Sequence, residues 1–173
     1  MLGSLIKQWR ALAARQVAVV CAENDAAIIT ELERLGFPAE QRIFNPDPDR
    51  GMFSSIQCAA QWNGWQTELT HWILVLGDQP HLRDQTLRTL IDFAQQHADP
   101  VCQPVYSGHR RHPVVLPKKV FQQLGNSTAS DLKHFLTPFA SAACQINDPG
   151  LELDIDDPED YERARNMYLE EKS

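Results

Sequence analysis

The sequence predicts an α/β domain with a doubly wound, mostly parallel sheet covered by helices on both faces. Short apolar runs of strand length alternate along the chain with amphipathic segments of helix length. Neither an internal repeat nor a low-complexity linker interrupts the 173 residues. A chain of this length is long enough to bury one sizeable core. We therefore expect residues 1–173 to form a single domain.

Five elements are expected in the first third of the chain. Apolar residues at helical spacing predict the first helix, and the apolar run that follows predicts a strand buried on both faces. Asn24 or Asp25 can cap the second helix, which Gly36 ends. The expected ranges are a helix at 3–14, a strand at 17–22, a helix at 26–35, a strand at 41–44 and a helix at 52–61.

The rest of the chain continues the alternation. Residues 72–76 are the strongest strand candidate, and Asp84 is expected to cap the amphipathic helix that follows. Pro158 is expected to begin the last helix, because proline is best tolerated in the first helical turn. The other expected ranges are helices at 85–97, 118–124 and 129–135, and strands at 101–105, 113–116, 140–146 and 151–155.

Composition excludes several classes of function. The net charge of −7 argues against sequence-independent binding to nucleic acid. No apolar run approaches the roughly 18 residues of a membrane span, and the N-terminus does not resemble a signal peptide. The four cysteines have no metal-ligand spacing, which predicts reduced thiols in a cytoplasmic protein. Dinucleotide-binding glycine motifs, P-loops and GxSxG elbows do not occur.

Carboxylates gather at two expected strand ends. Asp78 follows the apolar run that ends at Leu76, at the edge where parallel sheets bind ligands. By itself it suits a turn or cap as well as a ligand. Residues 152–162 contain seven acids, of which Asp154 and Asp156 would share one face of a strand. Such carboxylates repel one another unless a cation lies between them, and all-oxygen ligands suit Mg²⁺.

Two polar loops are candidates for anion contacts. The segment 107–113 (SGHRRHP) is either a solvated loop or a phosphate contact, since arginine matches phosphate oxygens well. The segment 45–55 (NPDPDRGMFSS) places Gly51, Ser54 and Ser55 at a helix start, where anions bind readily. Neither signal is specific alone. Another possible interpretation is a flavodoxin-like or phospho-acceptor domain in which Asp78 itself is modified.

Four segments in this order resemble the nucleotidyltransferases that attach a nucleotide to molybdopterin. They are NPDPDRGMFSSI, LVLGDQP, GHRRHPVVL and LDIDDPEDY. The resemblance is to the MobA-like NTP transferase family, above all to its molybdenum cofactor cytidylyltransferase-like branch. It extends from about Leu2 to Tyr161. Arg111 stands where the family has the glycine of its GHPV segment.

The resemblance implies a Rossmann-like domain of the nucleotide-diphospho-sugar transferase type. It implies an Mg²⁺-dependent transfer of a nucleotide, CMP from CTP, to the terminal phosphate of molybdopterin, with release of pyrophosphate. Asp78 matches the catalytic metal ligand, and Asp154 or Asp156 matches the second acidic position. Gly51, Ser54 and Ser55 match the nucleotide-side loop. His112 and Pro113 match the segment that faces the second substrate.

The family also begins with a strand and a glycine-rich LAAG…RMG loop that wraps the triphosphate. This chain starts in what matches the following helix, so we expect a missing first central strand and an N-terminally truncated domain. The chain is then a fragment of a longer reading frame or a degenerate member. The alternative function is an inactive homologue that serves as a cofactor-binding or accessory module. A molybdoenzyme or a chaperone is an expected partner. Oligomeric state and nucleotide specificity are not readable.

Overall fold

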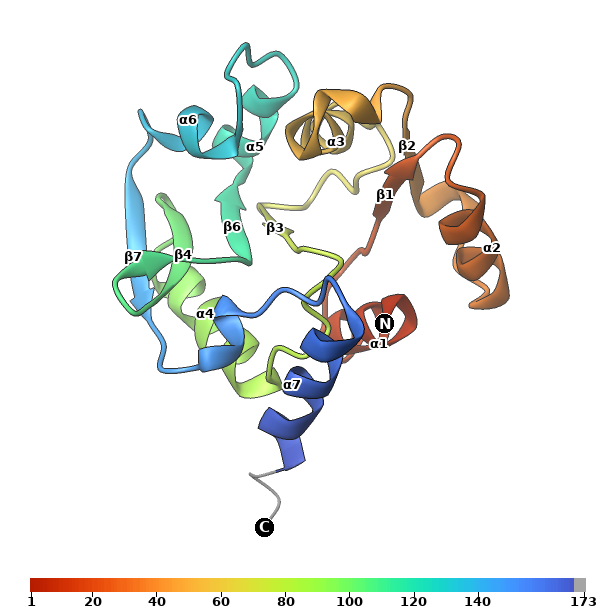
Figure 1. Cartoon of the computed structure of the whole chain (residues 1–173). Helices are drawn as coiled ribbons and strands as arrows, with labels where there is room; N and C mark the ends of the chain where they lie inside the picture. The colour runs from red at the N-terminus through yellow and green to blue at the C-terminus, as the bar shows by residue number, and fades with distance from the viewer. Residues whose placement is uncertain (170–173) are drawn as a thin grey trace. The chain divides into compact units, whose positions relative to one another are not determined.

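The computed structural model describes residues 1–169, which fall into two compact units. Unit 1 contains Met1–Ala13, Ile73–Leu116 and the described residues from Ala140 onward. Unit 2 contains Ala14–Trp72 and Pro117–Phe139. Each unit therefore combines segments that are distant in the sequence, as the colours of Figure 1 show.

Unit 1 is built on a sheet centred on β4. Its helices are α1 (Leu2–Ala11), α4 (Asp84–Gln96) and α7 (Pro158–Leu169), with a short 3₁₀ helix η3 (Pro149–Glu152). Its strands are β3 (His71–Leu74), which begins in unit 2, β4 (Val101–Tyr106), β5 (His109–Arg110), β6 (Val114–Pro117), whose last residue belongs to unit 2, and β7 (Ser141–Gln145). The strand order is β3-β6-β4-β5, and β7 pairs with β4.

The direction of pairing in this sheet is mixed. β4 runs parallel to β7, from Val101 opposite Ser141 to Val105 opposite Gln145, and antiparallel to β5 and β6. Ser107 and Gly108 join β4 to β5 in a two-residue turn, and both have positive φ, as a type I′ hairpin requires.

A tight apolar core lies between α4 and the sheet of unit 1. Leu90 and Ala94 of α4 pack with Cys102 of β4, Val115 of β6 and Cys144 of β7, and all five side chains are buried. Figure 1 shows α4 beside β4 and β7. Ile73 of β3, the strand that precedes Asp78, packs against the same core.

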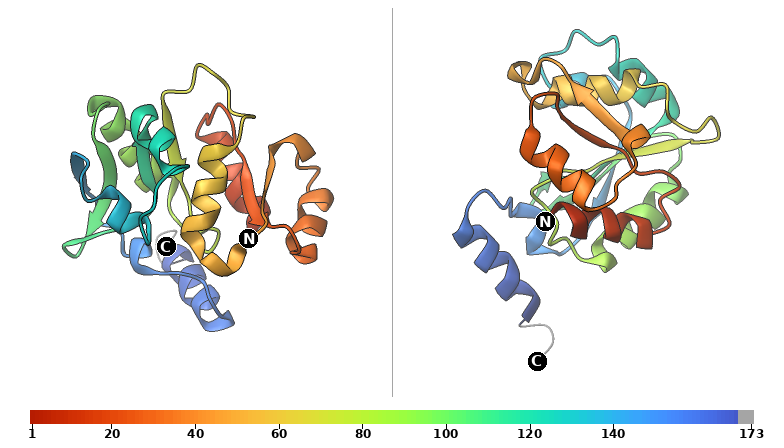
Figure 2. Two further views of the ribbon diagram at one scale, coloured as in Figure 1. Left: turned by 90° about the horizontal axis from the view of Figure 1, so that it is seen from above. Right: turned by 90° about the vertical axis from the view of Figure 1, so that its right-hand side faces the viewer.

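The last helix has a small core of its own. Ala164 of α7 is buried against Leu153 and Ile155, and Met167 packs against the same cluster. In the right-hand view of Figure 2, α7 extends away from the sheet of unit 1.

Unit 2 contains the parallel pair β1 (Val19–Ala22) and β2 (Arg42–Asn45). Its helices are α2 (Ala26–Arg34), α3 (Met52–Gln61), α5 (Lys118–Leu124) and α6 (Leu132–Leu136), with 3₁₀ turns η1 (Ala39–Gln41) and η2 (Pro48–Arg50). Helix α3 contacts β1, β2 and α5. Trp72 of β3 and Phe121 of α5 stack with their ring centroids 4.4 Å apart, which ties the first half of β3 to α5. Burial of such aromatic faces is a large apolar contribution to this core.

The expected fold class is confirmed, and most expected elements are present within one to three residues of their expected bounds. Asp25 is the cap of α2, because its Oδ1 accepts the N–H of Ile28 at 3.0 Å. Asp84 is not a cap: it is the first residue of α4, and Arg83 occupies the cap position. The strand expected at 151–155 is wrong. That segment forms η3 and then an extended stretch outside any sheet.

All four cysteines are free thiols. Cys21, Cys102 and Cys144 are buried, and burial raises the pKa of each thiol. Within residues 1–169, no helix combines the length and the apolar character needed to span a membrane.

Candidate active site

Two acidic segments of unit 1 lie side by side. Asp78 follows the end of β3, and its backbone carbonyl accepts the N–H of Ile155 at 3.0 Å. This bond places Asp78 opposite the residues that flank Ile155, which are Asp154 and Asp156. Leu153 and Ile155 are buried, whereas Asp154 and Asp156 are exposed. The alternation expected from the sequence is therefore present, although no strand forms.

The carboxylate of Asp78 is held in an unfavourable environment. Its Oδ1 is buried and has no hydrogen-bond partner among the described residues. Burial raises the pKa of Asp78; a hydrogen bond from its own backbone opposes this rise, and the negative charges of Asp154 and Asp156 add to it. A buried carboxylate oxygen without a donor is costly, and a cation would relieve both the desolvation and the repulsion. The site therefore fits a divalent cation.

Asp154 is held by its neighbour in the GDQP segment. The Nε2 of Gln79 donates to Oδ1 of Asp154 at 2.7 Å. Asp156 is placed differently, because its backbone N–H donates to Oδ2 of Asp160 at 3.2 Å at the start of α7. The two acids thus receive different support from the surrounding structure.

His112 belongs to the same cluster. Burial lowers its pKa, and this effect exceeds the opposing effects of a hydrogen bond with the Leu74 backbone and of the Asp154 and Asp78 charges. Its Nδ1 is buried and has no partner among the described residues. Pro113 follows through a cis peptide bond and is fully buried. His112 is therefore half-buried beside the carboxylates, whereas Pro113 belongs to the core.

The carboxylates do not form a complete metal cage. Within the described residues, no group of three or more His, Cys, Asp or Glu side chains could hold a metal ion. Mg²⁺ usually keeps several waters and takes one or two protein carboxylates together with substrate phosphates. The arrangement around Asp78 suits that mode of binding better than a closed structural site.

The other predicted segment lies in unit 2, where it borders a pocket of about 240 Å³. The pocket is lined by Asn45, Pro46, Asp47, Arg50, Ser54, Gln57, Cys58, Gln61 and Gly125. Gln57 and Gln61 donate their amides to backbone carbonyls of the 124–127 turn, which fixes the pocket wall. Asp47 and Arg50 are the charged residues of this lining.

Gly51, Ser54 and Ser55 all have structural roles in this loop. Gly51 precedes α3 with φ 83° and ψ 178°, a conformation that is essentially restricted to glycine. The buried amide of Asn45 donates to the hydroxyls of Ser54 at 2.8 Å and Ser55 at 2.9 Å. Ser54 lines the pocket, whereas Gly51 and Ser55 are not among its lining residues.

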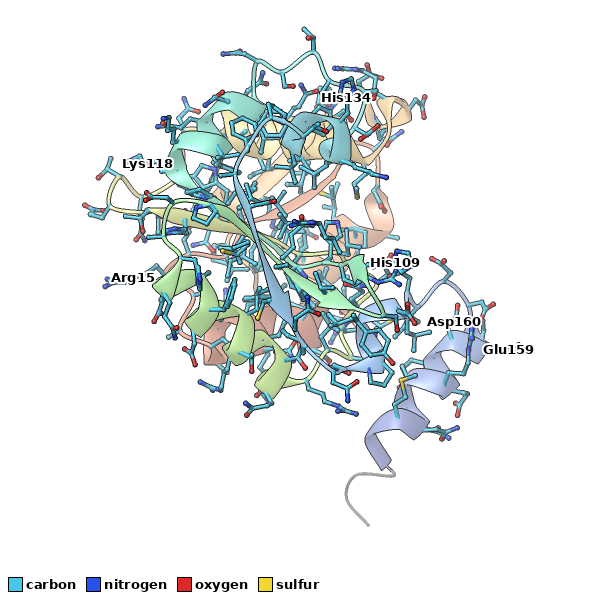
Figure 3. The ribbon with its side chains drawn as sticks, turned by 90° about the vertical axis from the view of Figure 1, so that its left-hand side faces the viewer. Arg15, His109, Lys118, His134, Glu159 and Asp160 are labelled. Atoms are coloured by element: carbon cyan, nitrogen blue, oxygen red, sulfur yellow. The ribbon has the colours of Figure 1, made fainter. Side chains whose placement is uncertain are left out.

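The arginines of the basic loop already have partners. Arg111 forms an ion pair with Glu152, and Arg110 donates to the Ser141 hydroxyl at 3.0 Å. A phosphate would compete with these contacts. In Figure 3, His109 marks the β5 hairpin, and Glu159 and Asp160 mark the start of α7.

Three polar residues near these segments were not singled out by the sequence. Asn45 and Gln79 are buried and orient predicted site residues. Asp148 is buried, accepts from the Thr86 hydroxyl, and accepts the N–H of Gly150 at 2.9 Å, so it fixes the turn before the acidic segment. A sequence signal for Asn45 and Gln79 exists: each is a polar residue directly before a proline, Asn45 in the NPDPDRGMFSSI segment and Gln79 in the LVLGDQP segment. Asp148 has the same signal in DPG.

Comparison with known proteins gives one family and several structural neighbours. Residues 1–143 match the family described as the MobA-like NTP transferase domain. A relative is the molybdenum cofactor cytidylyltransferase of Escherichia coli (strain K12), 27% identical over 129 residues, which are 74% of this chain and 64% of the relative. The chain thus spans less than two thirds of that relative's length.

The solved structures show the same fold at low identity. A homologue of the Mycobacterium tuberculosis protein Rv0371c, from Mycobacterium sp. strain JC1, has a TM-score of 0.72 at 18% identity, covering 97% of this chain and 83% of its own. Rv0371c of M. tuberculosis H37Rv in complex with manganese has a TM-score of 0.66 at 22% identity, covering 94% and 84%. Molybdopterin-guanine dinucleotide biosynthesis protein A of Archaeoglobus fulgidus has a TM-score of 0.63 at 14% identity, covering 96% and 86%.

Proposed function

Because this chain belongs to the MobA-like NTP transferase domain family, we propose that it is a nucleotidyltransferase of molybdenum cofactor biosynthesis. The proposed reaction transfers CMP from CTP to the terminal phosphate of molybdopterin. The observation that carries the proposal is the family match over residues 1–143. The choice of CTP rests on the relative from E. coli, which is named a cytidylyltransferase.

In the proposed reaction, an oxygen of the molybdopterin phosphate attacks the α-phosphorus of the nucleoside triphosphate. One P–O bond forms, the bond between the α- and β-phosphates breaks, and pyrophosphate leaves with the electron pair. Such transfers depend mainly on positioning and charge neutralisation. When bound, Mg²⁺ supplies the positive charge that this chemistry requires. A manganese complex is known for Rv0371c, whose fold is similar.

Each predicted residue has a proposed role in this reaction. Asp78, whose Oδ1 is buried without a partner among the described residues, would hold the cation, and Asp154 or Asp156 would supply the second carboxylate. Gly51, Ser54 and Ser55 contribute to the nucleotide side, with Asn45 fixing the two hydroxyls. His112 and Pro113 shape the side of the second substrate. A molybdoenzyme or its chaperone is the partner expected to receive the product.

The proposal is tested by measuring pyrophosphate release. The purified chain is incubated with molybdopterin, Mg²⁺ or Mn²⁺, and each of CTP, GTP, ATP and UTP in turn. We expect release with CTP and a loss of at least ~100-fold in Asp78→Asn, because a metal-holding carboxylate is removed. Asp92→Asn, which changes an exposed carboxylate on α4, is the matched control.

Two results would change the proposal in different ways. Release with GTP in place of CTP would correct the nucleotide and keep the reaction. Binding of molybdopterin without pyrophosphate release from any of the four nucleotides would contradict the proposed reaction and favour the accessory-module alternative.

A further inference from the structure

We propose that Gln79 is a positioning residue that orients Asp154, so that Asp154, and not Asp156, joins Asp78 in binding a divalent cation. This inference rests on the proposed function, because it concerns the cation site of that reaction. It adds a residue that neither the sequence motifs nor the family match assigns a role.

The contact between Gln79 and Asp154 has one chemical interpretation. A carboxylate can only accept hydrogen bonds, so the nitrogen of the amide must face it. The Nε2···Oδ1 distance is 2.7 Å, and the bond joins residues that are 75 positions apart in the sequence. It therefore couples the segment that carries Asp78 to the segment that carries the acids.

The Gln79 side chain is buried, and its bond to Asp154 is the one hydrogen bond that its amide makes among the described residues. Gln79 is only 3% exposed, although glutamine is normally a surface residue. Its other polar atom, Oε1, is buried and has no partner among the described residues. Folding gains nothing from burying an acceptor without a donor. The burial of Gln79 is therefore better explained by the hydrogen bond that its nitrogen donates to Asp154 than by a gain in stability.

An amide is also the appropriate donor for a cation site. Asp78 and Asp154 repel each other, so an unrestrained Asp154 would favour rotamers that point away from Asp78. Gln79 restrains Asp154 through Oδ1 without adding a positive charge. A lysine or arginine would neutralise the carboxylate and compete with the cation. The neutral donor preserves the charge, and the other carboxylate oxygen can serve the cation.

Asp156 lacks this support. Its backbone N–H is bonded to Asp160 of α7, so its position follows the helix start. In the part of the chain that the structure describes, no side chain donates a hydrogen bond to the Asp156 carboxylate. The backbone bond of Ile155 holds both acids near Asp78, but among the described residues only the side chain of Asp154 is itself bonded to the segment that carries Asp78.

The test measures binding of Mn²⁺ alone to the full chain, by electron paramagnetic resonance of the free ion. Gln79→Met removes both polar atoms and keeps the approximate length of the side chain. We expect Mn²⁺ affinity to fall at least ~10-fold, as is usual when a residue that orients a metal ligand is lost. The Tm should stay equal or rise, because the unpartnered Oε1 is removed. Gln79→Glu should weaken binding similarly, because it replaces the donor with a like charge.

Substitutions of the acids complete the design. Asp154→Asn should weaken Mn²⁺ binding at least ~10-fold, and adding Gln79→Met to it should cause little further loss, because both changes act on one interaction. Asp156→Asn is the matched substitution: it removes one nearby negative charge but no proposed ligand, so it should weaken Mn²⁺ binding clearly less than Asp154→Asn does.

The outcomes separate this inference from the proposed function. If the wild-type chain binds Mn²⁺ and Gln79→Met lowers the Tm without changing affinity, Gln79 is merely structural and the inference is overturned, while the proposed function stands. An Asp156→Asn variant that loses as much affinity as Asp154→Asn also overturns it. If the wild-type chain does not bind Mn²⁺ either with or without CTP, there is no cation site, and both this inference and the proposed function are contradicted.

Discussion

At the scale of single residues, the unusual group is Asp78, whose carboxylate is placed where folding disfavours its charge. Burial raises its pKa above 3.8, so the folded chain prefers the protonated form. The stability contributed by this preference is complete below pH 3.8 and is lost as the pH rises through the raised pKa. At neutral pH an ionised Asp78 therefore lowers the free energy of unfolding.

This environment gives a first prediction. Asp78→Asn should raise the Tm at pH 7 in the absence of metal, although it removes the proposed activity. The difference from the wild type should shrink as the pH falls through the raised pKa of Asp78 toward 3.8, because protonation then neutralises the wild-type carboxyl. Thermal unfolding followed by circular dichroism between pH 3.5 and pH 8 measures this. Asp92→Asn should not reproduce the pattern, and an Asp78→Asn variant less stable than the wild type at pH 7 would contradict it.

Gly51 gives a second prediction at the same scale. Its φ of 83° and ψ of 178° exclude side chains, yet a Cβ placed there would meet no atom within 4 Å. Gly51→Ala should therefore cost only backbone strain, about 1–3 kcal/mol of unfolding free energy. Chemical denaturation measures this. Gly77→Ala is the matched control, because Gly77 also has open space and has no positive φ. Equal stability of both variants would contradict the prediction.

At the scale of elements, the start of α7 forms a reciprocal pair of caps. Asp157 Oδ1 accepts the N–H of Asp160 at 2.9 Å, and Asp160 Oδ2 accepts the N–H of Asp157 at 3.3 Å. This is the geometry of a capping box with two aspartates. Burial acts to raise the pKa of Asp160, but the bonds from the Asp156 and Asp157 backbone and the contact with Arg163 lower it.

The capping pair leads to a third prediction. Because the folded pKa of Asp160 is lowered, its contribution is present above pH 3.8 and is lost as the pH falls through the lowered value. Amide exchange at Asp156 and Asp157, corrected for intrinsic rates, should be protected at pH 6 and lose protection at acidic pH. Asp160→Ala should abolish the protection at pH 6. Glu159→Ala, in the same helical turn, should retain it, and equal exchange in both variants would contradict the assignment.

The elements also show how far the sequence could predict this molecule. Alternation of L-E-L-D-I-D predicted that Asp154 and Asp156 share a face, and their exposure agrees. The same alternation predicted a strand, which does not form, because pairing requires a free neighbouring edge and periodicity does not report one. Asp84 looked like a cap but lies inside α4, since the chain enters the helix one residue earlier. Helix bounds of this kind depend on the tertiary path.

In the candidate site, too, some residues could be predicted from the sequence and others could not. Acidic residues at a strand end can be recognised in the sequence, because a charged residue stands out directly after an apolar run. The contacts of Gln79 with Asp154 and of Asn45 with Ser54 are not visible, because a polar residue reveals its partner only in the folded chain. The sequence therefore predicted which residues carry charge, and the structure identified which residues hold them.

At the scale of the whole molecule, the described chain separates into two units, yet neither is a continuous segment. Unit 1 combines three segments and unit 2 combines two. A unit of this kind cannot be removed by one cut, because its core requires chain on both sides of the other unit. The prediction of one domain over 1–173 rests on length and on the absence of a linker, and it stays a prediction. Its consequence is a single cooperative unfolding transition.

The buried thiols can test that consequence unit by unit. Cys102 and Cys144 are buried in unit 1, and Cys21 is buried in unit 2, so each reacts only after its own unit opens. Pulsed alkylation in increasing urea, read by mass spectrometry, gives an opening free energy for each thiol. We predict that the values for Cys21 and Cys102 agree within about 1 kcal/mol and fall with the same urea dependence, because one transition exposes both.

Cys58 is only half-buried, so a Cys58→Ser background removes its early reaction. If Cys21 becomes reactive at clearly lower urea than Cys102 and Cys144, the units unfold separately and the chain has two cooperative domains.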